Sequence, residues 1–327
     1  MVDLTGTNNV PEYNTAVAMG LFDGLHYGHR TVIRYAADIA ERFRDAVPAV
    51  FTFDTASVTS KGVDCILSRE MKFELIDGLG VKYIYSPDFM NFKDLSGEDF
   101  VQLVLCDKLF AKYAVCGEDF RFGKGAAWGV AELDRLCRKS GITLYVVPPV
   151  REDGGERVSS TLIRKLIKEG KIEEANVMLG SRFTLKLPVA YGRQLGRKLD
   201  FPTINQYLPK RQIAPRFGVY ASRTEVCGRV YRSVTNVGVK PTVGSDAPLA
   251  ETYIIDFDGG ELYGETARVS LISFIRPERK FDGIDELKKQ IAEDTARAAA
   301  VPESLYSGTR CKCTDIENNT ERNDING

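Results

Sequence analysis

The two histidines of this chain, His26 and His29, stand three residues apart in the segment GLFDGLHYGH, which begins at Gly20. An apolar stretch precedes this segment and an amphipathic stretch follows it, so we expect a turn between a strand and a helix. Its glycines, which include Gly24 and Gly28, let the backbone turn sharply and approach a ligand closely. The helix N-terminus offers free N–H groups and a positive dipole end to an anion. Two imidazoles there can bind phosphate oxygens and stabilise the charge that develops during attack on an α-phosphorus.

Other interpretations of the histidine pair stay open on the residues alone. The histidines can be incidental to function. A zinc site would need further ligands, and the chain has no third histidine and no CxxC pair. The dinucleotide fingerprint GxGxxG is absent from this turn, which disfavours a Rossmann oxidoreductase. A looser glycine cluster at Gly123, Gly125 and Gly129 is a weak sign of a nucleotide loop.

A second segment with phosphate-binding chemistry is RVSSTLIR, which begins at Arg157. Ser159 or Ser160 can cap a helix, and Thr161 and Arg164 are then neighbours on its first turn. Hydroxyls, N–H groups and a guanidinium converge there, which suits the phosphates that leave as pyrophosphate. The alternative is an ordinary capped surface helix.

The elements that must position these residues follow two different patterns of hydrophobicity along the chain. Up to about residue 180, short apolar runs alternate with amphipathic ones, which predicts a doubly wound parallel sheet with helices on both faces and ligands at the carboxyl ends of the strands. Residues 1–14 are polar, and we expect them to be loose. The expected strands are 16–20, 49–53, 82–85, 113–116 and 143–147, and the expected helices are 29–44, 68–79, 97–110, 131–140, 161–169 and 172–178.

After Ser181 the pattern becomes β-rich, with strands expected at 183–190, 217–224, 229–237, 251–257 and 266–274. This predicts a β-barrel or β-sandwich, closed by one helix with Ile284, Leu287 and Ile291 on its apolar face. The polar residues from 302 onward predict a disordered tail. We therefore expect domains at 1–181 and 182–301, followed by a tail at 302–327.

The composition excludes several classes of protein. Forty-four Lys and Arg balance 45 Asp and Glu, which argues against a dedicated nucleic-acid binder. No apolar run approaches the ~18–20 residues of a membrane span, and the polar N-terminus is unlike a signal peptide, so we expect a cytoplasmic protein. Of seven cysteines, Cys65, Cys106, Cys116, Cys137 and Cys227 are expected to be reduced core residues; Cys311 and Cys313 in the tail leave a weak metal or redox role open.

The histidine segment resembles the HxGH motif of nucleotidyltransferases, and its longer form GxFDGxHxGH resembles the adenylyltransferase module of the bacterial bifunctional riboflavin kinase/FMN adenylyltransferase family. The segment CGEDFRFG, at 116–123, resembles the flavin-side loop of that module, and the segment at 157–164 its second nucleotide motif. The resemblance implies catalytic roles for His26, His29 and Arg164. It also implies substrate binding by Gly20, Phe22, Asp23, Gly24, Asp119, Arg157, Ser160 and Thr161. One departure is that the family's turn with proline and histidine after the second strand is replaced here by DTASV following Phe53.

The β-rich half contains no GxxxxGK[ST] loop, but it has a series of short segments that alone would be turns between strands. Together, and in this order, they resemble a riboflavin kinase module: GRQLGR at 192–197, FPTIN at 201–205, NVGVKPT at 236–242, ETYIIDF at 251–257, LYGE at 262–265 and FIRPE at 274–278. The resemblance implies that Thr203 and Asn205 are ligands of ATP-bound Mg²⁺ and that Glu251 is the catalytic base. It implies substrate binding by Gly192, Gly196, Arg197 and Arg276. The departures are Asp200 for glycine and Ile204 for alanine.

The expectation from the resemblance is an enzyme that phosphorylates riboflavin with Mg²⁺·ATP and adenylylates FMN with ATP. Its partners would be these small molecules, with no nucleic acid and no membrane. Three alternatives stay open: a riboflavin kinase whose adenylyltransferase half is inactive, a flavin- or nucleotide-binding regulator without turnover, and a relative that uses another nucleotidyl acceptor such as a pantetheine or glycerol phosphate.

Overall fold

The computed structural model describes residues 1–54, 64–151, 155, 157–192, 201–239 and 247–307. The chain forms two compact units, Met1–Val150 and Arg151–Gly327. The division falls ahead of the expected boundary after Ser181, because two helices that precede this residue pack on the second unit. Each unit is described by itself.

The first unit is built on a six-stranded sheet in the order β1-β4-β3-β2-β5-β6, and all its strand pairs are parallel. In chain order the strands are β1 (Val2–Asp3), β2 (Thr15–Met19), β3 (Val47–Phe51), β4 (Tyr83–Tyr85), β5 (Ala111–Gly117) and β6 (Thr143–Val147). The five strands expected from the sequence are thus confirmed within a few residues.

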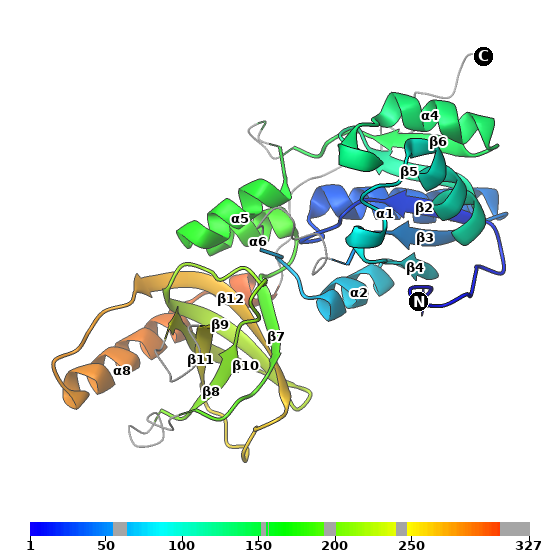
Figure 1. Cartoon of the computed structure of the whole chain (residues 1–327). Helices are drawn as coiled ribbons and strands as arrows, with labels where there is room; N and C mark the ends of the chain where they lie inside the picture. The colour runs from blue at the N-terminus through cyan, green and yellow to red at the C-terminus, as the bar shows by residue number, and fades with distance from the viewer. Residues whose placement is uncertain (55–63, 152–154, 156, 193–200, 240–246, 308–327) are drawn as a thin grey trace. The chain divides into compact units, whose positions relative to one another are not determined.

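Helices cover both faces of this sheet, as Figure 1 shows. They are α1 (Tyr27–Phe43), α2 (Arg69–Asp77), α3 (Gly97–Asp99), the π-helix η3 (Phe100–Lys108) and α4 (Val130–Lys139), with 3₁₀ turns η2 (Phe89–Asn91) and η4 (Lys124–Ala126). Alternate residues of β2 enter different cores: Ala16 and Ala18 pack with residues of α1 and α2, and Val17 and Met19 with residues of η3 and α4. This confirms the doubly wound α/β fold.

One expectation for the first unit is wrong, and another is confirmed in extent with a different type of helix. The N-terminus is not loose: β1 pairs with β4, Leu4 is fully buried and the amino group of Met1 lies 2.7 Å from a carboxylate oxygen of Asp77. The helix expected at 97–110 is present over 97–108, but after a single turn, α3, it continues as the π-helix η3. The N–H of Leu109 accordingly bonds to the carbonyl of Val104, five residues earlier, at 3.0 Å.

The second unit carries a six-stranded antiparallel sheet in the order β7-β12-β9-β10-β11-β8. Its elements are α5 (Ser160–Glu169), α6 (Ile172–Leu179), β7 (Thr184–Pro188), β8 (Thr203–Tyr207), β9 (Gly218–Val226), β10 (Arg229–Val239), β11 (Pro248–Ile254), β12 (Thr266–Pro277), α8 (Ile284–Ala300) and α9 (Glu303–Ser307). Of these strands, β8 had no counterpart in the sequence expectations.

The sheet curls into a nearly closed barrel, which confirms the barrel expected for this half of the chain. A backbone bridge joins its two ends: the N–H of Ala190, just after β7, bonds to the carbonyl of Asn205 on β8 at 2.8 Å. Buried Gln206 reinforces the seam by donating to the carbonyls of Leu187 and Ala267. The helix α6 packs on the barrel through Asn176, whose side chain donates to the carbonyl of Leu271 and accepts from the N–H of Phe183.

Two expectations for the C-terminal part need correction. The buried face of α8 consists of Gln290, Asp294 and Ala298 rather than the expected isoleucines and leucine, and Ile284 is 60% exposed. Residues 303–307, expected to belong to a disordered tail, form α9, where Glu303 pairs with Arg232 of β10. Cys311 and Cys313 lie outside the described residues.

The five described cysteines are free thiols, as expected, but they do not all lie in the core. Burial raises the pKa of both Cys116 and Cys137 to about 12, so these thiols stay protonated and unreactive. Cys227 is exposed, because together with Gly228 it forms the tight turn between β9 and β10, where both residues have positive φ.

Candidate functional site

The turn that carries the histidines leaves the carboxyl end of β2, next to β5. In this sheet the chain runs from β2 to β3 on one side and later returns to β5 on the other, so the switch point lies between β2 and β5. The helix α1 begins at Tyr27, with His26 at its N-cap. The sequence therefore places the histidine motif where open α/β sheets bind ligands.

Buried side chains hold this turn in a strained backbone conformation. Phe22 and Leu25 have positive φ values of 49° and 44°, and both side chains are almost fully buried. Their burial keeps the backbone in a region that L-residues rarely adopt. A Cβ on Gly20 would lie 2.7 Å from the ring of Phe22, so glycine is required there for close packing.

The structure brings the two histidines together. The rings of His26 and His29 are stacked with their centroids 3.6 Å apart and an interplanar angle of 22°, and the ring of Phe22 meets His29 edge-on at 5.4 Å. Two cationic imidazoles at this distance would repel one another, and a bound anion would offset that repulsion. The arrangement therefore suits an anionic ligand at the start of α1.

Asp23, expected to bind substrate, has a structural bond as well. Its side chain is 3% exposed, and its Oδ1 accepts the N–H of Ile66 at 3.0 Å. This bond fastens the turn after β2 to the segment that precedes α2. A ligand-binding role for Asp23 stays a prediction.

The loop after β5 lies beside the histidine turn, because β5 and β2 are paired neighbours. A Cβ on Gly117 would lie 3.1 Å from Oδ1 of Asp119, which places this carboxylate over the end of the strand. Beyond it Phe120 and Phe122 are stacked with centroids 6.0 Å apart, and Trp128 contacts Phe122 at 6.4 Å. Phe122 belongs to the buried core, while Phe120 and Trp128 are half-buried against it, so these two rings can offer an apolar face to a flat aromatic ligand. Sequence reasoning missed Trp128, although it is the only tryptophan of the chain.

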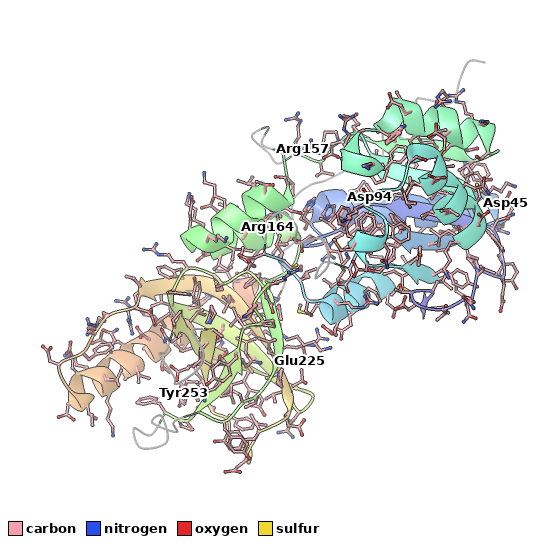
Figure 2. The ribbon with its side chains drawn as sticks, in the orientation of Figure 1. Asp45, Asp94, Arg157, Arg164, Glu225 and Tyr253 are labelled. Atoms are coloured by element: carbon pink, nitrogen blue, oxygen red, sulfur yellow. The ribbon has the colours of Figure 1, made fainter. Side chains whose placement is uncertain are left out.

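The second phosphate motif lies in the second unit, on and before α5. Of the two candidate capping residues the structure selects Ser159, whose hydroxyl accepts the N–H of Leu162 at 3.3 Å. Ser160 and Thr161 then open the helix, and Arg164 follows one turn later. Figure 2 labels Arg157 ahead of this helix and Arg164 on it.

The candidate kinase residues lie in one row across the barrel. Asn205 on β8 pairs in register with Glu251 on β11, which pairs in turn with Asn236 on β10. Their chain neighbours Thr235 and Thr252 are fully buried and bonded to one another at 2.9 Å. Because side chains alternate along a strand, the row faces away from that buried layer. The structure thus brings Asn205 and Glu251 together and adds Asn236, whose place depends on a register that the sequence does not reveal.

The residues around Asn205 fit an ATP-bound magnesium ion. Thr203 lies two residues before Asn205 on the same face of β8, so both offer neutral oxygen ligands, which Mg²⁺ accepts beside phosphate oxygens and water. A Cβ on Gly192 would clash with the side-chain amide of Asn205, so a larger residue here would displace that side chain. Gly196 and Arg197 lie outside the described residues. Ile204, a departure from the family, is buried and faces Thr252 in the register.

Arg276, expected to bind substrate, makes a buried ion pair. It belongs to β12 at the far end of the same row, and its guanidinium contacts both carboxylate oxygens of Asp294 on α8 at 2.8–3.1 Å. The carboxylate also accepts from Gln290, and the two charged side chains are only 15% and 2% exposed. This pair fastens α8 to the barrel and explains why the buried face of the helix is polar. A substrate contact by Arg276 stays a prediction.

Comparison with known proteins gives matches to both halves. A family model described as FAD synthetase matches residues 9–162, and one described as riboflavin kinase matches residues 179–301. The chain is 36% identical over 294 residues to the bifunctional riboflavin kinase/FMN adenylyltransferase of Bacillus subtilis, covering 87% of this chain and 91% of that protein. The enzyme of the same name from Escherichia coli is 31% identical over 299 residues, covering 89% and 94% of the two chains.

A solved structure shares the whole architecture. A Streptococcus pneumoniae protein, titled a macrolide-efflux protein, superposes with a TM-score of 0.81 at 28% identity and covers 92% of this chain and 100% of its own. In the described part of the present chain, no helix is both long and apolar enough to span a membrane. The extent of the curated matches, together with the two family models in succession, shows that this chain belongs to the bifunctional riboflavin kinase/FMN adenylyltransferase family.

Proposed function

We propose that this chain phosphorylates riboflavin to FMN with Mg²⁺·ATP, and then transfers AMP from a second ATP to FMN, giving FAD and pyrophosphate. The observation that carries the proposal is the stacked pair of His26 and His29 at the switch point, in a chain whose barrel sets Glu251 opposite Asn205. The substrates and the free thiols suit the cytoplasm.

In the kinase step Glu251 accepts the proton of the ribityl hydroxyl as this oxygen attacks the γ-phosphorus of ATP. The bond between the γ-phosphorus and its bridging oxygen breaks, and ADP leaves. Thr203 and Asn205 would hold the magnesium ion, which neutralises developing phosphate charge when bound. The protein's own contribution is proton transfer and positioning.

In the adenylyl step a phosphate oxygen of FMN attacks the α-phosphorus of ATP, and pyrophosphate leaves. His26 and His29 at the N-terminus of α1 stabilise the charge on the α-phosphate as the new bond forms. We assign binding of the leaving group's phosphates to Ser160, Thr161 and Arg164 on the resemblance of their segment to the family's second nucleotide motif. The aromatic residues after β5 receive the flavin ring.

The test is a time course with riboflavin, ATP and Mg²⁺, in which riboflavin, FMN and FAD are separated. We expect FMN to appear first and FAD to follow. FMN without FAD, also when FMN is supplied, would indicate that only the kinase half is active. Binding of flavin without any product would indicate a regulator.

A further inference from the structure

A lysine is buried in the first unit beside the histidine turn, where the mechanism so far gives it no role. Lys72 lies in the first turn of α2 and is 1% exposed. A solvent-exposed lysine keeps its charge in water, so a fully buried one needs compensating partners. The hydrogen-bond partners of its amine indicate which segments it holds together.

The Nζ of Lys72 joins two segments that follow different strands. It donates to the carbonyl of Leu21 at 2.8 Å, in the turn after β2, and to the carbonyl of Phe53 at 3.0 Å, after β3. The third bond, at 2.6 Å, goes to the hydroxyl of Thr52, which itself donates to the carbonyl of Leu21. Three N–H groups thus meet three oxygens, and the amine of Lys72 and the hydroxyl of Thr52 together join the two segments.

Lys72 can keep its hydrogen bonds in either protonation form. Burial lowers the pKa of its amino group to about 7, opposed by Asp23, Asp54 and Cys65 and assisted by Arg69. In the neutral form the amine still donates to both carbonyls, while the hydroxyl of Thr52 can turn and donate to the nitrogen. The link between the two strand ends therefore persists through neutral pH.

Leu21 stands between Gly20 and Phe22, and Phe22 is the ring that contacts His29. We propose that Lys72 is a positioning residue for adenylyl transfer, which holds the turn from Gly20 to His29 against the carboxyl end of β3. A purely structural role is a poor explanation, because an apolar side chain of similar length would fill this site at lower cost than a buried amine. The inference rests on the proposed function of the first unit.

The test compares Lys72→Met with a matched control, Lys108→Met. Lys108 lies in the same unit and also donates to two carbonyls, of Thr7 at 2.7 Å and Asn9 at 2.9 Å, but away from the histidine turn. For Lys72→Met we expect the kcat for FAD formation from FMN to fall by about 10²-fold, because a shift of the catalytic groups by about 1 Å has an effect of this size. The KM should change much less. Its unfolding temperature should stay near that of Lys108→Met, whose FAD formation should be normal.

The inference is overturned if Lys72→Met makes FAD within about three-fold of the parent rate. It is also overturned if activity and unfolding temperature fall together in both variants. Should Lys72→Met fail to fold, Thr52→Val decides: it keeps the lysine and the side-chain shape but removes the hydroxyl shared with Leu21, and it should lower kcat for FAD formation. A normal kcat in that variant refutes the inference. If the parent chain forms no FAD, the proposed function itself has failed.

Discussion

Glu251 on β11 lies directly opposite Asn205 on β8, the residue through which the barrel closes. Side chains directly opposite one another in an antiparallel pair have Cβ atoms about 5 Å apart. The proposed general base and the proposed magnesium ligand are therefore held at a separation that depends only on strand pairing. The loops can then vary without disturbing the spacing of these two groups.

Replacing Glu251 with Gln should lower the rate of riboflavin phosphorylation by ~10²–10⁴, because the amide keeps the shape but cannot take a proton. Riboflavin and ATP binding should change little, and FMN should still be converted to FAD. Glu225→Gln is the control, because this residue is an exposed glutamate on β9 of the same barrel (Figure 2). Loss of both activities in Glu251→Gln would point to misfolding, and an unchanged kinase rate would remove Glu251 from the mechanism.

Asn236→Asp should move the acid side of the kinase pH–rate profile to higher pH. The new carboxylate stands beside Glu251 in the register, and two like charges at this distance disfavour ionisation of both. Asn236→Ala, which adds no charge, should leave the position of that limb unchanged. Identical pH profiles for the parent and Asn236→Asp would show that this residue does not face the base.

Replacing His29 with Ala should lower FAD formation from FMN by ~10²–10³, because one charge-stabilising donor is lost at the α-phosphate. Riboflavin phosphorylation should continue at the parent rate. Both rates can be followed in one assay by separating the three flavins. Adenylyl transfer that survives within about three-fold would contradict the role of the histidine pair.

Breaking the ion pair of Arg276 and Asp294 with Asp294→Asn should lower the free energy of unfolding of the second unit by about 3–5 kcal/mol, because it leaves a buried charge uncompensated. Denaturant titration measures the effect. The exposed pair of Arg279 and Glu286, at 3.0 Å, is the control, and Glu286→Gln should cost less than about 1 kcal/mol. Equal effects of the two variants would mean that the buried pair does not anchor α8.

Lys72 should make the unfolding free energy of the first unit depend on pH between about 7 and 10.5. Its pKa is about 7 in the folded chain and near its ordinary value of 10.5 in the unfolded chain. Above pH 10.5 both states are neutral; as the pH falls towards 7 the unfolded state alone gains a proton, so folding becomes less favourable, and below 7 the difference stays constant. The unfolding free energy of Lys72→Met relative to the parent should therefore be higher at pH 7 than at pH 10. A pH-independent difference would show that the amine titrates alike in both states.

The sequence is sufficient to predict elements whose pattern is local. The strands from β2 to β6 show as apolar runs between amphipathic stretches, and the histidine pair is marked by its place after the first of them. The strand β8 was missed because it begins directly after Pro202 and its residues, TINQY, do not alternate regularly between polar and apolar side chains. The resemblance, rather than any periodicity, supplied its Thr203 and Asn205.

Features that depend on distant pairing could not be predicted. The local sequence does not reveal that Arg276 forms an ion pair with Asp294. The apolar residues of α8 therefore suggested the wrong buried face. Lys72 is similar: lysine is common on exposed helix surfaces, and only the packing of α2 beside the ends of β2 and β3 makes it an internal donor. The row from Asn205 to Asn236 is fixed by strand register, which a single sequence does not reveal.

The bridge between Ala190 and Asn205 has a thermodynamic consequence for the barrel. The backbone of Asn205 closes the seam, while its side chain is proposed to hold the metal of the nucleotide, so local opening and ligand release involve the same residue. A ligand that binds only the closed form stabilises it by RT ln(1 + L/Kd), where L is the free ligand concentration, so the closed form gains stability as the ligand concentration rises. We therefore expect amide hydrogen exchange at the seam to slow when nucleotide is bound.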